Sequence, residues 1–189
     1  MRIHQLLNEA CRVHDALVND GGICEQIGAW VDAMVGALRQ GNRIILCGNG
    51  GSFSDAQHIT AEFVGRFQME RRSLPAICLG TNSSTATAIG NDYGFEHIFS
   101  RELSAIGNSG DVLIALSTSG NSANILAAID TAVSLGMIVF GLTGSKKGAM
   151  ASRCSCIEVP SESTPRIQEC HILIGHILCD CIEHRLFSR

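Results

Sequence analysis

Five short apolar segments recur along the chain, and stretches with helical periodicity separate most of them. The apolar segments cover residues 44–47, 76–79, 112–116, 137–142 and 156–159, and the clearest helical patterns cover 54–67, 121–135 and 165–187. Nearly continuous apolar strands are typical of parallel sheets buried on both faces, whose crossovers are usually helices. The alternation therefore predicts an α/β fold with a parallel sheet between two layers of helices.

The size and composition of the chain are those of one compact domain. It has 189 residues, of which 46% are hydrophobic and 17% charged, and no internal repeat or linker divides it. We therefore expect a single domain over residues 1–189. Amphipathic patterns over 3–19 and 27–38 precede the first strand, and we expect these N-terminal helices, within residues 1–40, to serve oligomerisation.

Charge and hydropathy exclude several classes of partner. The formal net charge is −4, whereas binding to a nucleic-acid backbone usually requires a basic face. The sequence contains no run of eighteen apolar residues and no signal-peptide core at the N-terminus. We expect a cytoplasmic protein that binds neither membranes nor nucleic acid.

The nine cysteines are scattered and include two C-x-C pairs, Cys154/Cys156 and Cys179/Cys181, but no C-x-x-C. An odd number at irregular spacing does not indicate a disulfide framework. A zinc site built from thiolates is a weaker interpretation than small buried hydrophobic side chains in a reducing compartment.

Two turns rich in glycine and hydroxyl groups follow predicted strands. Gly48–Ser52 precedes the helical pattern that begins at 54, and Ser117–Ser122 precedes the pattern over 121–135. In a parallel sheet both turns lie at the carboxyl edge, where hydroxyls and helix-start amides can bind an anion. Such residues also cap helices, and Ser52 with Asp55 has the spacing of a capping box. Two turns on one edge favour an anion site, although neither matches a nucleotide-binding fingerprint.

His58 and Glu62 are one helical turn apart and point to the same side of the predicted helix. This spacing suits two metal ligands or an acid/base pair. It is also common in ordinary surface helices, so the pair alone does not establish a site.

The C-terminal apolar helix carries three polar interruptions, Gln168, His171 and His176. A buried polar side chain costs free energy unless it has a partner. Gln168 and His176 lie two turns apart on one broad side, which favours a shared site. His171 points elsewhere, and we interpret it as structural or interfacial. The segment 91–94 (Asn-Asp-Tyr-Gly) has the composition of a turn.

Taken together, four motifs closely resemble the bacterial phosphoheptose isomerases, which are sedoheptulose-7-phosphate isomerases of the sugar-isomerase (SIS) domain class. The resemblance covers nearly the whole chain and rests on the order of the motifs. They are Gly48-Asn49-Gly50-Gly51-Ser52 followed by Asp55, His58 and Glu62; Gly90-Asn91-Asp92-Tyr93-Gly94; Ser117-Thr118-Ser119-Gly120-Asn121-Ser122; and Arg166-Ile167-Gln168 with His176.

This resemblance implies a three-layer α-β-α sandwich with a five-stranded parallel sheet, assembled as a homotetramer with active sites at subunit interfaces. It implies one zinc ion per subunit, surrounded by His58, Glu62, Gln168 and His176. The substrate contacts it implies are Asn49, Gly50, Gly51, Glu62, Asn91, Asp92, Ser117, Thr118, Ser119, Ser122 and Gln168.

The reaction implied is conversion of D-sedoheptulose 7-phosphate to D-glycero-D-manno-heptose 7-phosphate through an enediol(ate), as the first step of nucleotide-activated heptose and lipopolysaccharide biosynthesis. Glu62 and His176 are the expected catalytic residues. One alternative is a SIS-type interaction protein that binds the replication initiator, but that relative lacks the acid and histidine matching these positions. Another is a different SIS-type sugar-phosphate enzyme or sensor.

Three residues, in two segments, depart from the pattern of this family. Phe53 and Ser54 stand where small residues are common, and Asn82 stands where many members have an acid. We expect Phe53 to reshape the mouth of the sugar pocket, and Asn82 to remove any charge-dependent contact there.

Overall fold

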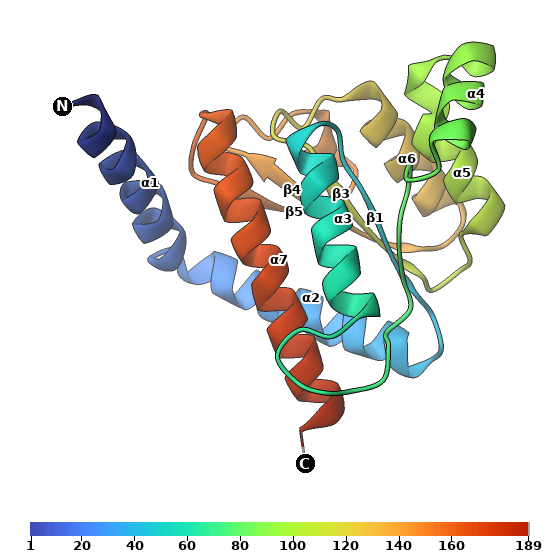
Figure 1. The fold of residues 1–189 in the computed structure, drawn as a ribbon, viewed down its shortest axis with the longest axis horizontal. Coiled ribbons are helices and arrows are strands. Elements are labelled where there is room, and N and C mark those ends of the chain that lie inside the picture. Colours follow the sequence, from blue (N-terminus) through green and yellow to red (C-terminus); the bar gives the residue numbers. More distant parts are fainter. Residues whose placement is uncertain (189) are drawn as a thin grey trace.

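The computed structural model describes residues 1–188 (Figure 1). Helices and strands alternate along most of the chain after two N-terminal helices. The helices are α1 (Arg2–Val18), α2 (Gly21–Arg39), α3 (Gly51–Val64), α4 (Ser83–Tyr93), α5 (Ile98–Ile106), α6 (Ala123–Ser134) and α7 (Thr164–Phe187), with 3-10 turns η1 (Phe95–His97) and η2 (Ala149–Ser152). The strands are β1 (Ile44–Cys47), β2 (Ala76–Cys78), β3 (Val112–Leu116), β4 (Ile138–Gly144) and β5 (Ser155–Val159).

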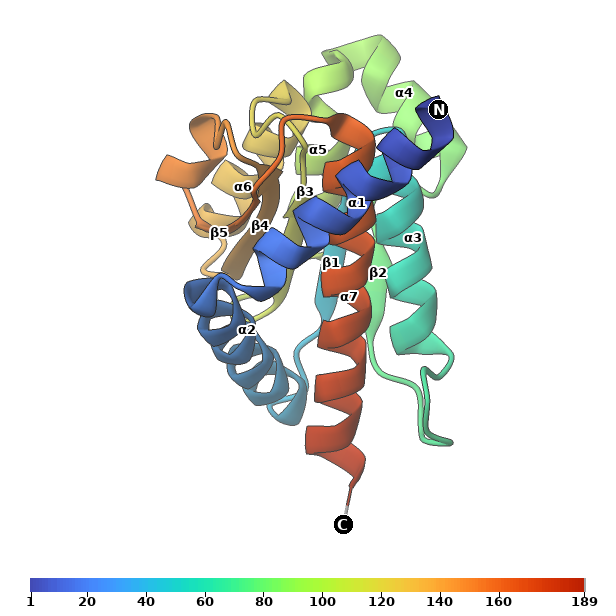
Figure 2. The same ribbon diagram turned by 90° about the vertical axis from the view of Figure 1, so that its left-hand side faces the viewer.

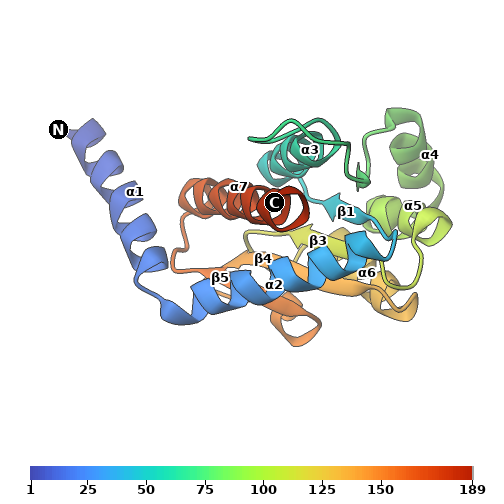
Figure 3. The same ribbon diagram turned by 90° about the horizontal axis from the view of Figure 1, so that it is seen from below.

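The strands form one parallel sheet in the order β2-β1-β3-β4-β5. Successive side chains of β1 point to opposite faces. Ile44 and Leu46 join a core with α2, α3 and α7, whereas Ile45 and Cys47 join a second core with α5 and α6. Figure 3 shows α3 and α7 on one side of the strands and α6 on the other. The predicted five-stranded parallel sheet between helical layers is confirmed.

Helix α1 projects from the rest of the molecule (Figures 1 and 3). Among its residues only Leu17 is buried, and the apolar side chains Ile3, Leu6 and Leu7 are exposed. An apolar stripe of this kind usually faces another surface. The prediction that the N-terminal helices serve oligomerisation concerns other copies of the chain and stays a prediction.

Helix α3 begins earlier than predicted, within the glycine-rich turn, so the predicted capping box is wrong. Gly50 occupies the N-cap position with a positive φ of 55°, and the helix begins at Gly51 rather than at 54. Ser52 and Asp55 therefore lie inside the first two turns. Positive φ is readily adopted by glycine, which lets the chain turn directly from the loop into the helix.

Residues 83–106 form α4, η1 and α5, which the sequence patterns did not predict. The segment 91–94, interpreted as a turn, is the last part of α4 followed by Gly94 at φ 98°. Helix α4 has no buried residue in the part of the chain that the structure describes, so it lacks the apolar periodicity that predicts helices.

All nine cysteines are free thiols. Four of them, Cys47, Cys78, Cys170 and Cys179, are buried as expected, but Cys11 and Cys24 are exposed, which corrects the interpretation for those two positions. None of the described helices is both long enough and apolar enough to span a membrane.

Candidate active site

Helices α3 and α7 run side by side (Figures 1 and 2) and approach closely because a glycine lies between them. A Cβ atom at Gly175 of α7 would overlap the side chain of Ile59 of α3. Small residues at a contact let two helix backbones come together. The side chains that flank this contact, from either helix, consequently meet across the groove.

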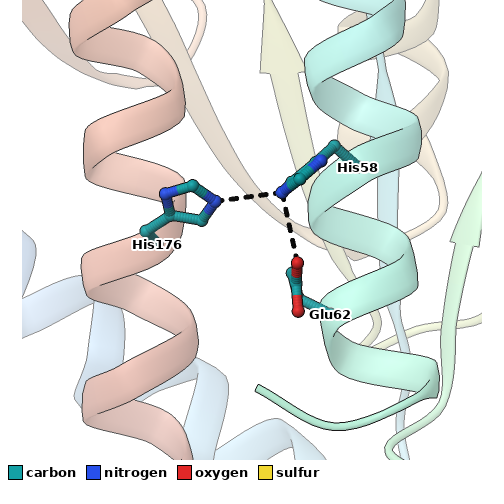
Figure 4. A group of neighbouring side chains, drawn as sticks. All are labelled: His58, Glu62 and His176. Carbon is teal, nitrogen blue, oxygen red and sulfur yellow. Dashed lines mark hydrogen bonds and ion pairs between the residues drawn. The ribbon is translucent and has the colours of Figure 1, made fainter. Parts of the chain in front are cut away.

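Three of the predicted ligands meet there: His58 and Glu62 from α3, and His176 from α7 (Figure 4). His58 Nε2 lies 3.1 Å from His176 Nε2 and 3.2 Å from Glu62 Oε1. One ligand atom from each residue lies within 4.8 Å of the others. Two imidazoles and one carboxylate are the donor set of many catalytic zinc sites, which keep a further position open. The three residues therefore fit a metal ion.

Gln168 is not part of this group within one chain. Its amide lies against Gly51, where it occupies the space of a Cβ atom. Eight residues of helix separate it from His176, a rise of about 12 Å, and helical side chains lean toward the N-terminus. The structure thus places Gln168 beside the glycine-rich turn, and its predicted role as a zinc ligand stays a prediction.

The two turns expected to bind substrate lie at the carboxyl ends of the adjacent strands β1 and β3. Asn49 of the first turn and Asn124 of α6 exchange two side-chain hydrogen bonds of 2.8 Å each. Asn124 is buried, so this pair fixes the glycine-rich turn to the helix that follows the second turn.

The turn at Ser117–Ser122 leaves donors available for an anion. The hydroxyls of Ser117 and Ser122 lie 3.1 Å apart. Ser122 is the N-cap of α6, yet its side chain makes no capping hydrogen bond within residues 1–188. Amides at the start of α6 and these hydroxyls are what a phosphate group binds at a helix N-terminus. Thr118 and Ser119 line a neighbouring cavity of about 170 Å³ together with Lys146.

Asn91 and Asp92 lie exposed at the end of α4, where the Asn91 amide donates to the Asp92 carboxylate at 2.8 Å. Among the described residues, Asp92 does not belong to the His58–Glu62–His176 group. Asn82 caps α4 by accepting a hydrogen bond from the Thr85 amide at 3.2 Å. It therefore has a structural role that needs no charge.

Phe53 points toward the helices after β2. It lines a cavity of about 190 Å³ with Phe95 and Phe99, beside the backbone of Gly48 and Gly50. These neighbours place Phe53 next to the glycine-rich turn. The expectation that it reshapes the mouth of a sugar pocket stays a prediction.

Asp55, interpreted from the sequence as a capping residue, instead lies within α3 close to the candidate ligands. It lies one turn before His58, and burial raises its pKa to about 6 although the nearby His58 acts in the opposite direction. Its Oδ2 is buried and accepts no hydrogen bond from the described residues. The sequence evidence for this position was its place in the first motif of the family resemblance, three residues before a candidate ligand.

The loop after α3 covers His176, a contact that the sequence did not predict. The Phe67 ring stacks on the His176 ring with centroids 5.6 Å apart. Glu183 holds the loop by accepting hydrogen bonds from the amides of Phe67, Gln68 and Met69 at 3.1, 2.7 and 2.7 Å, and from Arg71 Nε at 2.8 Å. Burial raises the pKa of Glu183, but these four donors together lower it below its usual range.

Of the two interpretations of His171, structural or interfacial, burial within the single chain supports the structural one. It is buried, and its Nε2 lies 3.4 Å from the carbonyl oxygen of Thr143. Burial lowers its pKa to about 4, with the backbone hydrogen bond acting in the opposite direction. A neutral imidazole can donate from Nε2 to this strand carbonyl, whereas its buried Nδ1 has no hydrogen-bond partner among the described residues.

Comparison with known proteins places this site in a family. The model of the SIS domain matches residues 17–144. The phosphoheptose isomerase of Rhodospirillum rubrum is 52% identical over 92% of this chain and 93% of its own length. That of Burkholderia pseudomallei is 49% identical over 96% and 92%. The solved phosphoheptose isomerase of Francisella tularensis superposes with a TM-score of 0.93 at 38% identity, covering 97% of both chains.

These relatives give no support to the alternative of an interaction protein that binds a replication initiator. They are enzymes by name, and the match extends over the helices and turns that form the site described above. The chain belongs to the SIS domain family and, within it, to the phosphoheptose isomerases.

Proposed function

We propose that this protein is an aldose–ketose isomerase that converts D-sedoheptulose 7-phosphate to D-glycero-D-manno-heptose 7-phosphate. One observation carries the proposal: α3 and α7 bring His58, Glu62 and His176 together, and the chain is similar to named phosphoheptose isomerases. Glu62 and His176 are the acid/base residues that an interaction protein would not need. We place the reaction in the cytoplasm, as the first step of heptose activation.

The turns at the sheet edge would hold the substrate. The phosphate is assigned to the Ser117–Ser122 hydroxyls and the first amides of α6. Asn49, Gly50 and Gly51 would contact the sugar chain, with Gln168 beside them. Fixing both ends of a flexible substrate orients C1 and C2 toward the acid/base residues, and such positioning contributes several kcal/mol to catalysis.

Proton transfer is assigned to Glu62 and His176. Glu62 takes the proton from C1 of the ketose and returns it to C2, while His176 protonates O2 and removes the proton from O1. No atom is gained or lost, so the ketose becomes the aldose through an enediol(ate). Zinc, if held by His58, Glu62 and His176, would supply Lewis-acid polarisation of the substrate oxygens. Ligation and proton transfer use the same lone pairs, so Glu62 and His176 would each carry protons only while loosened from the ion.

We also propose a homotetramer in which neighbouring copies complete each site. Two features support this: the exposed apolar stripe of α1, and the separation of Gln168 from His176 along one helix. One copy would then supply Gln168 to the His58–Glu62–His176 group of another. Co-expression of the inactive variants Glu62→Gln and Gln168→Ala would restore part of the activity in mixed tetramers. Mixed tetramers as inactive as either parent would contradict the shared site.

The reaction is tested directly with purified protein and sedoheptulose 7-phosphate. We expect the aldoheptose 7-phosphate to accumulate, to stop accumulating with a chelator, and to resume when zinc is restored. A wild-type protein that turns over no faster than Glu62→Gln with zinc supplied would rule the isomerase out.

A further inference from the structure

Three sulfur-containing side chains converge above one glycine on the face of the sheet opposite α3 and α7. Cys156 of β5 pairs with Gly141 of β4. A Cβ atom at Gly141 would lie 2.5 Å from Met150 Cε, 2.7 Å from Cys156 Sγ and 3.1 Å from Cys154 Sγ. The missing side chain therefore makes the room in which the three sulfur residues meet. They belong to the core of α5 and α6, separate from the His58–Glu62–His176 group.

The distance between the two thiols is compatible with a shared metal ion and too long for a disulfide. The sulfurs of Cys154 and Cys156 are 3.6 Å apart. A disulfide requires about 2.05 Å, so the sulfurs would have to approach by roughly 1.5 Å. Two thiolates each about 2.3 Å from one ion stand about 3.8 Å apart at a tetrahedral angle. The observed spacing thus needs almost no change to hold an ion.

The two thiols are half-buried, so a small ion can reach them. The two sulfurs are within hydrogen-bond distance of each other, and Cys154 Sγ also lies 3.7 Å from the carbonyl oxygen of Met150. Glu158, the nearest acid along the strand, is paired with Lys147 at 2.9 Å and does not add a hard oxygen ligand.

We propose that Cys154 and Cys156, with the Met150 thioether as a third ligand, form a binding site for a soft monovalent cation, Cu(I). Thiolate and thioether ligands select Cu(I), whereas zinc, magnesium and calcium sites use nitrogen, oxygen or a complete set of four ligands. On binding, each thiol releases its proton to solvent and the ion remains Cu(I), so no electron is transferred. The site is independent of the proposed isomerase reaction.

The test is a titration of the reduced, zinc-loaded protein with Cu(I) in competition with a chromogenic Cu(I) chelator. Ultraviolet absorption of the Cu(I)–thiolate bond reports binding to sulfur rather than to imidazole. We expect the wild-type protein to bind one equivalent of Cu(I) tightly. Cys154→Ser and Cys156→Ser should each weaken it at least about tenfold, and Met150→Leu by a smaller factor. A Cys11→Ser/Cys24→Ser variant, which removes the exposed thiols, should keep the tight equivalent.

Unchanged isomerase activity and circular dichroism in the serine variants would show that they fold. The proposal is overturned if the Cys154→Ser/Cys156→Ser protein binds its first Cu(I) as tightly as the wild type. It is equally overturned if the pair oxidises to a disulfide in air and the reduced protein shows no tight equivalent.

Discussion

The two halves of the candidate site are built differently. The His58–Glu62–His176 group consists of side chains on two packed helices, whose spacing is set by the contact of Gly175 with Ile59. The half proposed to bind substrate consists of backbone amides and short hydroxyls on turns, tied together by Asn49 and Asn124. Long side chains on rigid helices suit proton transfer, and turns suit binding. Changes in the first half should therefore affect kcat, and changes in the second half KM.

The largest effect is expected for Glu62→Gln. Removing a positioned general base costs roughly 10²- to 10⁴-fold in kcat, whereas KM should change little because the turns remain intact. Turnover measured with and without added zinc checks this. Glu70→Gln, an exposed acid after the same helix, should leave kcat unchanged. Retention of most of the activity by Glu62→Gln would remove the distinction between the two halves.

Glu183→Gln should act on the helix half through stability. Its carboxylate accepts hydrogen bonds from three amides and from Arg71 while almost fully buried. Breaking a buried charge pair of this kind costs about 3 kcal/mol of the free energy of unfolding. Urea denaturation at neutral pH measures the difference between the variant and the wild type.

The same carboxylate gives that difference a defined pH dependence. Because the folded state lowers the pKa of Glu183, its contribution is present above the ordinary pKa of about 4.3 and is lost as pH falls through the lower, folded-state value. The stability gap between wild type and Glu183→Gln should therefore close on acidification. A gap that widens as the pH falls would show that the carboxylate is not the stabilising form.

Ser122→Ala tests the binding half. A lost hydrogen bond to a charged group costs about 1.5–3 kcal/mol, which corresponds to roughly 10- to 100-fold in kcat/KM. We expect most of this loss in KM, because the hydroxyl is assigned to the phosphate and not to the reacting carbons. Ser134→Ala, at the other end of α6, is the matched control. A loss confined to kcat would place Ser122 in the wrong half.

The smallest effect is expected for Phe67→Leu. An aromatic stack is worth about 0.5–1.5 kcal/mol beyond area burial, so the variant should lose a few-fold in kcat and in zinc affinity as His176 becomes less firmly held. Phe67→Tyr keeps the ring and should restore both. If Phe67→Leu lowers thermal stability alone, with unchanged zinc affinity and kcat, the ring does not position His176.

The features that the sequence predicted are those with local periodicity. The apolar strands, helix α7 and the shared face of His58 and Glu62 all follow from residues close in sequence. The hydrogen bonds between Glu183 and the loop at Phe67 join residues more than one hundred positions apart. Such a contact cannot be predicted from the spacing of residues along the sequence. The helical pattern indicated the side of α7 on which Gln168 lies, but not that its amide lies against Gly51.

Asp55 was assigned to the wrong structural role because its spacing fits a common helix-capping pattern. Its spacing from Ser52 fits a capping box, but the positive φ of Gly50 lets the helix begin before either residue. Helix α4 was missed for the opposite reason, because it has too little buried surface to leave a pattern among the residues described.

The contact between Gly175 and Ile59 has a consequence for the choice of ion. It sets the width of the groove that the three ligands span, and ions differ in radius: zinc accepts nitrogen and oxygen ligands at about 2.0–2.2 Å, calcium at about 2.3–2.6 Å. A methyl group at 175 would lie 2.4 Å from Ile59 Cδ1, about 1 Å inside ordinary van der Waals contact, and would push α3 and α7 apart. Gly175, which has no side chain, would thus help to determine the size of the bound ion. We expect Gly175→Ala to shift the metal-binding preference of the protein toward larger cations.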